Sequence, residues 1–260
     1  MSEFWSGGNF ELPSLNHPWL RADALIETLK TIDGNAYFLN RHLARLSRSI
    51  SELKYIGGDI AQIAAMVLEM AKNDKFSRGR LRITYFSNGD YLITHHAIDI
   101  DRTATYRLGI APYPRYSKGF LAGHKTLAYT EASFGQRIAD EHGYEDLLYL
   151  NEREEIVETG FANLLIEIDG KLVTPPVNSG ALPGIVRELL LDWFPVISER
   201  EIHRVELGSV SGLYLLSSIR EIHPINSVID GDSEFIFTDS AEVKALRAEF
   251  QERSDSDPNS

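Results

Sequence analysis

Four segments of the sequence carry groups that could do chemistry together, and two of them offer reactive side chains. Lys125 lies in the stretch 122–127 among small and apolar residues. Loss of water there would disfavour its ammonium form and leave a nucleophilic amine. Glu158 lies between two apolar stretches, where a buried carboxylate needs a cationic or hydrogen-bonding partner. Taken singly, an exposed loop lysine and a turn glutamate explain these two residues equally simply.

The other two segments offer groups that could hold an anion. Arg45 lies in a stretch where Leu43 and Leu46 recur at helical spacing, and taken alone it is a solvated helix residue. Gly184 opens a helix in the segment 180–188, and the free N–H groups of a helix start can hold a phosphate. Loop-to-helix joins are common, so the chemistry depends on the four segments acting jointly.

In their order along the chain, these segments resemble the class IV aminotransferase family. The motifs are His-Leu-x-Arg-Leu at 42–46, then Lys125, then Glu-x4-Asn at 158–163, then Leu-Pro-Gly-Ile-x-Arg at 182–187. The resemblance covers residues 24–225 and implies a fold-type IV pyridoxal-phosphate enzyme. Members include branched-chain and D-amino acid aminotransferases and aminodeoxychorismate lyase. The implied fold is α+β, with two domains in the D-amino acid aminotransferase-like architecture.

The resemblance also implies a role for each matching residue. Lys125 matches the catalytic lysine, which forms a Schiff base with pyridoxal 5'-phosphate and then moves protons at the substrate carbon. Glu158 matches the acid that pairs with the pyridine nitrogen of the cofactor, and Arg45 matches the arginine that grips its phosphate. The remaining matches to cofactor-binding positions are Asn163, Ile185, Val186, Ser217 and Ser218. Of the two serines, Ser218 is preferred as the donor to the phosphate.

Two stretches, Ile26–Gly34 and Ser218–Arg220, are most similar to aminodeoxychorismate lyases. The expected reaction is therefore release of pyruvate and 4-aminobenzoate from 4-amino-4-deoxychorismate, in folate synthesis. The alternatives are a class IV aminotransferase of the branched-chain or D-amino acid type and, from a different class, a non-catalytic scaffold. The resemblance further implies a homodimer.

The sequence departs from the family at three places. Relatives have asparagine three residues after the lysine, where this chain has Ala128. The arginine with which D-amino acid aminotransferases hold the substrate carboxylate is replaced near Tyr85, which weakens that alternative. The family segment Phe-Gly-Asp-Gly before the first hairpin is missing, and only Arg-Ala-Asp-Ala at 21–24 remains. These departures make the choice between lyase and aminotransferase the open question.

Hydrophobic periodicity and turn residues predict the elements that must position these groups. In the first part of the chain the predicted order is strand, strand, helix, helix, strand, strand, at 24–32, 35–39, 40–53, 59–72, 79–86 and 91–98. In the later part, helices are predicted at 126–142, from 184 and from 240, and strands at 147–150, 155–157 and 161–168. The proline- and glycine-rich stretch near 111–123 indicates a domain connection. We therefore expect a smaller N-terminal domain over 1–112, a connection over 113–123, and a larger cofactor-binding domain over 124–260.

Composition excludes several other functions. With 26 basic and 38 acidic residues the net charge is −12, which argues against a nucleic-acid partner. The absence of cysteine excludes disulfides, thiolate metal sites and a cysteine nucleophile. Neighbouring His95 and His96 would point to opposite faces of a strand, so no metal site is expected. The first twenty residues lack a secretory pattern and no apolar run is long enough to span a membrane, so a cytoplasmic protein is expected. The family resemblance implies a small-molecule amino substrate.

Overall fold

A computed structural model describes residues 4–6, 17–74, 76–101 and 103–258. The prediction that the first twenty residues lack a secretory signal rests partly on residues outside these ranges. The chain forms two compact units, which we describe separately. The first unit contains residues up to Ile100, the segment His124–Ala128 and the residues from Gln251 onward; the second contains Asp101–Gly123 and Tyr129–Phe250. The division of the chain at 113 and 124 remains a prediction.

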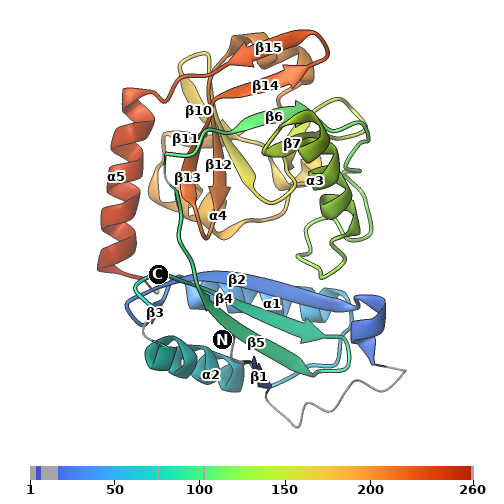
Figure 1. Ribbon diagram of the computed structural model, residues 1–260, viewed down its shortest axis with the longest axis vertical. Coiled ribbons are helices and arrows are strands. Elements are labelled where there is room, and N and C mark those ends of the chain that lie inside the picture. The colour runs from blue at the N-terminus through green and yellow to red at the C-terminus, as the bar shows by residue number, and fades with distance from the viewer. Residues whose placement is uncertain (1–3, 7–16, 75, 102, 259–260) are drawn as a thin grey trace. The chain divides into compact units, whose positions relative to one another are not determined.

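The first unit is built on a five-stranded sheet of order β1-β5-β4-β2-β3 (Figure 1). All its pairings are antiparallel, and β2 lies alongside β4 from Ala24 opposite Phe86 to Thr31 opposite Gly79. The turn residues Asp33 and Gly34 both have positive φ and join β2 to β3. The strands are β1 (Phe4–Ser6), β2 (Ala24–Ile32), β3 (Asn35–Ala36), β4 (Gly79–Phe86) and β5 (Tyr91–Ala97).

Two helices, α1 (Leu39–Glu52) and α2 (Ile60–Asp74), form one core with this sheet. Leu43, Leu46 and Ile50 of α1 pack with Leu25 and Leu29 of β2. Because side chains alternate along a strand, Glu27 lies on the same face of β2 as these two leucines. A carboxylate is thus placed on the helix-covered face of the sheet.

The segment 124–128 forms hydrogen bonds with β2 rather than joining a helix. The amide of Ile26 donates to the carbonyl of Lys125 at 2.8 Å, and the amide of Leu127 donates to the carbonyl of Ala24 at 2.8 Å. Since β4 occupies the other edge of β2, this segment extends the sheet beside the first residues of β2. The structure thereby fixes the backbone of Lys125 to the strand that carries Glu27.

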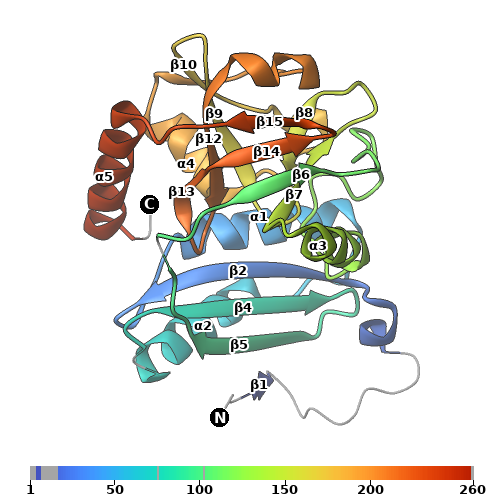
Figure 2. The same cartoon turned by 45° about the horizontal axis from the view of Figure 1, so that its top comes forward.

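The second unit contains two five-stranded sheets that share one hydrophobic core. One has the order β15-β14-β6-β7-β8, with β14, β6 and β7 parallel to one another (Figure 2). Its strands are β6 (Arg107–Ile110), β7 (Asp146–Leu150), β8 (Ile156–Thr159), β14 (Ser227–Asp230) and β15 (Ser233–Ile236).

The other sheet has the order β11-β10-β9-β12-β13. Buried residues such as Leu148 from the first sheet and Ile166 and Leu215 from the second belong to the same core. The strands of the second sheet are β9 (Asn163–Ile168), β10 (Lys171–Thr174), β11 (Ile197–Glu199), β12 (Val210–Ser217) and β13 (Glu221–Ile225). Nearly all side chains of β7, β8 and β9 are buried, as expected for strands covered on both faces.

Helices complete the unit. Ala139 of α3 (Thr130–His142) packs with Leu147 and Tyr149 of β7, while Leu189 and Leu190 of α4 (Ile185–Trp193) are buried. The last helix, α5 (Ala241–Ser256), contributes residues to both units. Short 3-10 turns lie at Pro18–Arg21, Val177–Ser179 and Arg204–Ser209. No described helix is long and apolar enough to cross a membrane.

The structure confirms the α+β class and most of the predicted elements, with three local corrections. The helix predicted from 126 begins at Thr130, because residues 125–127 are bonded to β2 instead. The strand predicted over 35–39 ends at Ala36. The helix predicted from residue 40 begins one residue earlier, at Leu39, and its N-cap residue is Phe38, with φ 57°.

Candidate active site

A buried ion-pair cluster in the first unit holds Arg45. Its Nε and Nη2 donate to the two carboxylate oxygens of Glu27 at 2.9 and 2.5 Å, a bidentate pair. The Nδ1 atom of His42, one turn earlier on α1, lies 2.6 Å from Glu27 Oε2. All three side chains are buried. Arg45 is therefore fixed by the β2 strand instead of being the solvated helix residue that its sequence context alone suggests.

Titration of this cluster follows from its geometry. Burial alone raises the pKa of Glu27, but Arg45 and the hydrogen bonds from His42 and Arg45 outweigh burial and hold that pKa at about 2. Burial lowers the pKa of His42, against the opposing effect of Glu27. The neutral imidazole then donates its Nδ1 hydrogen to Glu27. The cluster thus carries one carboxylate charge and one guanidinium charge.

Lys125 lies within electrostatic range of this cluster. Its charge contributes to the lowering of the His42 pKa, and its side chain is half-buried. Its neighbour His124 has Nδ1 3.0 Å from the hydroxyl of Ser49 on α1. The first unit thus brings Lys125 and Arg45 into one region, with the amine on the strand-like segment and the guanidinium on the helix.

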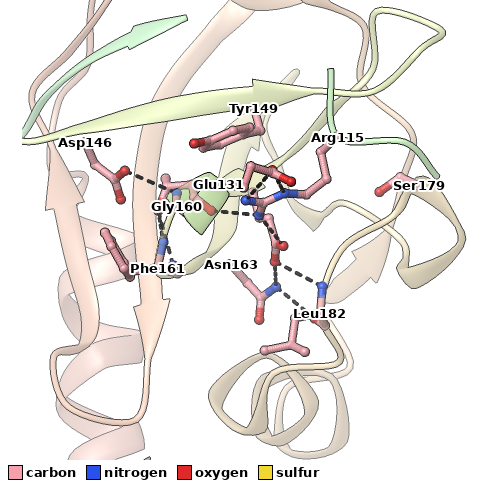
Figure 3. A network of polar contacts seen from close by, with 12 residues as sticks. Arg115, Glu131, Asp146, Tyr149, Gly160, Phe161, Asn163, Ser179 and Leu182 are labelled. Carbon is pink, nitrogen blue, oxygen red and sulfur yellow. Dashed lines mark hydrogen bonds and ion pairs between the residues drawn. The ribbon is translucent and has the colours of Figure 1, made fainter. Parts of the chain in front are cut away.

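In the second unit, Glu158 is a buried residue inside β8 and not part of a turn. Three donors reach its carboxylate: Arg115 Nη1 donates to Oε1 at 2.6 Å, while Asn163 Nδ2 and the Leu182 amide donate to Oε2 at 2.8 and 3.0 Å. Figure 3 shows these donors converging from three different segments of the unit. Three donors thus satisfy the hydrogen-bonding needs of this buried carboxylate.

Asn163 joins this carboxylate to the start of α4. Its Nδ2 also donates to the carbonyl of Leu182 at 2.8 Å (Figure 3), and a Cβ on Gly184 would lie 1.9 Å from its Oδ1. Gly184 is the N-cap of α4, and among the described residues no side chain caps that helix. The first amides of α4, from Ile185 and Val186, are thus at a helix start suited to an anion.

Ser217 and Ser218 lie at the end of β12, beside the same strand edge. Leu216 of β12 is the cross-strand partner of Asn163, the first residue of β9, so the two serines come immediately after the residue that pairs with Asn163. The hydroxyl of Ser217 accepts from the amide of Arg220 at 3.1 Å. The second unit therefore gathers the acid, the asparagine, the helix start and the hydroxyls that the sequence predicted.

Replacement of Gly184 by alanine tests whether Asn163 is held as tightly as the contacts indicate. Asn163 cannot give way to a new methyl group without losing its bonds to Glu158 and Leu182. We expect Gly184→Ala to cost about 1–3 kcal/mol in the free energy of unfolding, as an overpacked site does. Denaturant titration measures this cost, with Gly57→Ala as the control because a Cβ there meets nothing within 4 Å.

A double variant gives the sharper result. In an Asn163→Ala background the clash is absent, so the additional cost of Gly184→Ala should fall by at least about 1 kcal/mol. Equal costs in the two backgrounds would contradict the tight Gly184–Asn163 contact.

Comparison with known proteins decides the family of this site. The family described as Amino-transferase class IV matches residues 24–228, most of the chain. The chain belongs to the class IV aminotransferase family. Enzymes of this family depend on pyridoxal phosphate and act as transaminases or lyases, which confirms the resemblance, the enzyme class and the cofactor inferred from the motifs.

Individual relatives agree at this level. Branched-chain-amino-acid aminotransferase 2 of Bacillus subtilis is 34% identical over 112 residues, 37% of this chain and 31% of the relative. A probable branched-chain-amino-acid aminotransferase of Aquifex aeolicus is 24% identical over 216 residues, 72% of this chain and 68% of the relative. The chain thus spans about a third of the Bacillus enzyme in the matched region.

Solved structures show the same fold. A putative 4-amino-4-deoxychorismate lyase from Legionella pneumophila superposes with a TM-score of 0.83 at 20% identity, covering 94% of this chain and 96% of that one. The pyridoxal-phosphate-bound form of a hypothetical aminotransferase from Mycobacterium tuberculosis gives a TM-score of 0.81 at 18% identity, with 92% of each chain covered.

The residues present fit pyridoxal phosphate. The cofactor needs an amine for its aldehyde, a carboxylate for its ring nitrogen, and cations or amides for its phosphate. The chain has Lys125 near the Arg45 cluster in the first unit, and donor-lined Glu158 next to the uncapped start of α4 in the second. Among the described residues there is no cluster of three or more metal-ligating side chains.

Two residues of these clusters were not predicted from the sequence. Glu27 had a usable signal, because a carboxylate inside an apolar strand requires a partner, and His42 and Arg45 lie three residues apart on one helix face. Arg115 had none, because it lies in a loop without periodicity, and only the tertiary structure brings it to Glu158.

Proposed function

We propose that this chain is a pyridoxal-phosphate-dependent 4-amino-4-deoxychorismate lyase that releases pyruvate and 4-aminobenzoate. The observation that carries the choice is the likeness of Ile26–Gly34 and Ser218–Arg220 to aminodeoxychorismate lyases. These residues form β2 with its turn, beside the Lys125 segment, and the turn that follows β12. The fold shared with the putative lyase of Legionella pneumophila is consistent with this choice.

In this proposal, different residues serve the proton transfer and the binding of the cofactor ring. When bound, pyridoxal phosphate supplies a ring that accepts the electrons left as a proton leaves the substrate carbon. Lys125 Nζ would hold the cofactor through its aldehyde and would take the proton that leaves the substrate carbon. Glu158 accepts the hydrogen bond of the protonated ring nitrogen, and Asn163 keeps the carboxylate in place through its 2.8 Å bond.

The remaining residues hold the phosphate. Arg45, oriented by Glu27, supplies the charge, and the amides of Ile185 and Val186 supply donors at the start of α4. The hydroxyls of Ser217 and Ser218 complete the set, with Ser218 as the preferred donor.

A branched-chain aminotransferase is the second candidate, because the matching curated relatives from Bacillus subtilis and Aquifex aeolicus carry that name. Lys125, Glu158 and the phosphate-binding residues serve either reaction, since both begin with removal of a proton from the substrate carbon that bears the amine. A D-amino acid aminotransferase is less well supported. Tyr85, near the position where those enzymes hold the substrate carboxylate, is buried and donates to the carbonyl of Ile56 at 2.6 Å.

The decisive experiment supplies the cofactor-loaded protein with 4-amino-4-deoxychorismate and no keto acid. The lyase proposal predicts 4-aminobenzoate and pyruvate in equal amounts. Product formation that depends on an added 2-oxo acid would instead establish an aminotransferase. A protein that stays colourless in the presence of pyridoxal phosphate would contradict both the lyase and the aminotransferase and leave the non-catalytic scaffold as the remaining alternative.

We also propose that the protein is cytoplasmic and forms a homodimer, the dimer being what the family resemblance implies. Analytical ultracentrifugation of the loaded protein should give about twice the 29.3 kDa chain mass. A species at the chain mass at micromolar concentration would contradict this.

A further inference from the structure

Arg115 is a charged residue whose position nothing in the family motifs explains. It lies in the loop between β6 and α3, and its amide donates to the carbonyl of Leu150 at 2.8 Å. Its Nη1 donates both to Glu158 Oε1 at 2.6 Å and to the carbonyl of Thr159 at 3.1 Å. The guanidinium therefore grips the end of β8 through one side chain and one backbone group.

The loop that carries Arg115 is itself anchored. The amide and hydroxyl of Ser117 donate to the Glu152 carboxylate at 2.9 and 2.5 Å. Gly180 approaches the same loop so closely that a Cβ there would lie 3.1 Å from Ser117 Cα, and its φ of 107° requires glycine. A loop fixed on two sides presents Arg115 in a defined orientation.

The surroundings of the guanidinium keep it charged and oriented. It lies 4.2 Å from the centroid of the Tyr149 ring, and Tyr149 is the cross-strand partner of Glu158 (Figure 3). On its other side, Glu131 of α3 accepts from Nε and Nη2 at 3.3 and 3.2 Å. Burial lowers the pKa of Arg115, but Glu158 and Glu131 outweigh it and raise that pKa. Asp146 and the hydroxyls of Tyr113 and Tyr149 are the other titratable groups of this cluster.

The three donors leave the Glu158 carboxylate with few acceptor positions for further hydrogen bonds. A carboxylate has about four acceptor positions. Within the described part of the chain, Asn163 and the Leu182 amide occupy Oε2, and Arg115 occupies one position on Oε1. One acceptor position on Oε1 thus remains, which matches a ligand that offers a single N–H.

We propose that Arg115 is a positioning residue that holds the orientation of Glu158, so that the carboxylate accepts a hydrogen bond from the protonated ring nitrogen of pyridoxal phosphate. This inference rests on the proposed role of Glu158 toward the cofactor. Without Arg115, only the two donors on Oε2 would hold the carboxylate. It would then rotate, and the ring nitrogen would lose its hydrogen-bond partner.

The test uses Arg115→Gln, with Glu131→Gln as the matched control. Glu131 contacts the same guanidinium but does not touch Glu158, so the control alters the charge around Arg115 and leaves the Glu158 pair intact. Two quantities are measured: the dissociation constant of pyridoxal phosphate, and the pH dependence of the visible absorption band of the loaded protein. We expect Arg115→Gln to weaken cofactor binding by about 10–100-fold, in the range seen when a supporting group of a ligand-binding residue is removed.

The visible band should shift with pH in Arg115→Gln as it does in Glu158→Gln, while Glu131→Gln behaves like the parent. Arg115→Lys, which keeps the charge but not the planar fork, should restore part of the affinity. In the double variant, Arg115→Gln should add little to the effect of Glu158→Gln.

A merely structural role gives a different pattern. If Arg115→Gln lowers the melting temperature but leaves cofactor affinity and the band unchanged, the inference is overturned. The proposed role of Glu158 fails separately: Glu158→Gln would then also leave affinity and band unchanged. The lyase reaction itself is tested independently, by product formation without a keto acid. If Glu158→Gln alters them and Arg115→Gln does not, only the role of Arg115 is lost.

Discussion

Lys125→Ala should lose at least about 10⁴-fold in turnover and show no visible band on addition of pyridoxal phosphate. A positioned proton-transfer group alone contributes about 10²–10⁴-fold, and this variant also removes the covalent attachment of the cofactor. The fold of the first unit should survive, because the segment is held to β2 by the backbone carbonyl of Lys125 and the amide of Leu127. Steady-state assays and an absorption spectrum before and after borohydride treatment measure the two effects.

The control is Lys118→Ala, which removes an exposed lysine from the same segment between β6 and α3. It should keep the band, its sensitivity to borohydride and the turnover of the parent. A borohydride-sensitive band that persists in Lys125→Ala would show that another amine reacts with the cofactor.

Glu27→Gln should destabilise the protein by about 3–5 kcal/mol at pH 7, the typical cost of breaking a buried ion pair by removing one partner. The substitution keeps the shape of the side chain but leaves the buried Arg45 guanidinium without its bidentate carboxylate. Denaturant titration measures the loss. The control is Glu52→Gln, since the contacts of this exposed carboxylate with Arg48 at 3.9 Å and His124 at 3.6 Å should be worth no more than about 1 kcal/mol.

The same pair has a characteristic pH dependence. The pKa of Glu27 falls from 4.5 to about 2 on folding, so the unfolded chain binds more protons between these values. The stabilisation, about 3 kcal/mol, is fully present above pH 4.5 and is lost as the pH falls toward 2. The difference in unfolding free energy between the parent and Glu27→Gln should therefore shrink on acidification. A difference that stays constant from pH 7 to pH 3 would contradict the ion pair.

Much of the fold follows from local sequence signals. Extended runs over residues 24–32 and 79–86 that end in turn residues predict the two hairpins of the first unit, and apolar spacing predicts α1 and α2. The segment 124–128 could not be predicted this way. Its backbone bonds go to a strand a hundred residues earlier, and long-range pairing overrides its helical neighbours.

The candidate site likewise combines residues that the sequence predicts with contacts that only the structure shows. Lys125, Glu158, Arg45 and Gly184 were found because their types, order and spacing match one chemistry, which a single chain can reveal without coordinates. How each is held was not available from spacing. Arg45 is paired with Glu27 across a strand–helix contact, and Glu158 receives donors from three separate segments.

The sequence by itself thus determined the family and the cofactor class through the resemblance of its motifs, and it predicted the reacting groups from which side chains are present and in what order. Only the tertiary structure decided which carboxylates hold which cations. Glu27 fixes Arg45, and Arg115 supports Glu158, because burial removes water and obliges each charge to find a partner from a distant part of the chain.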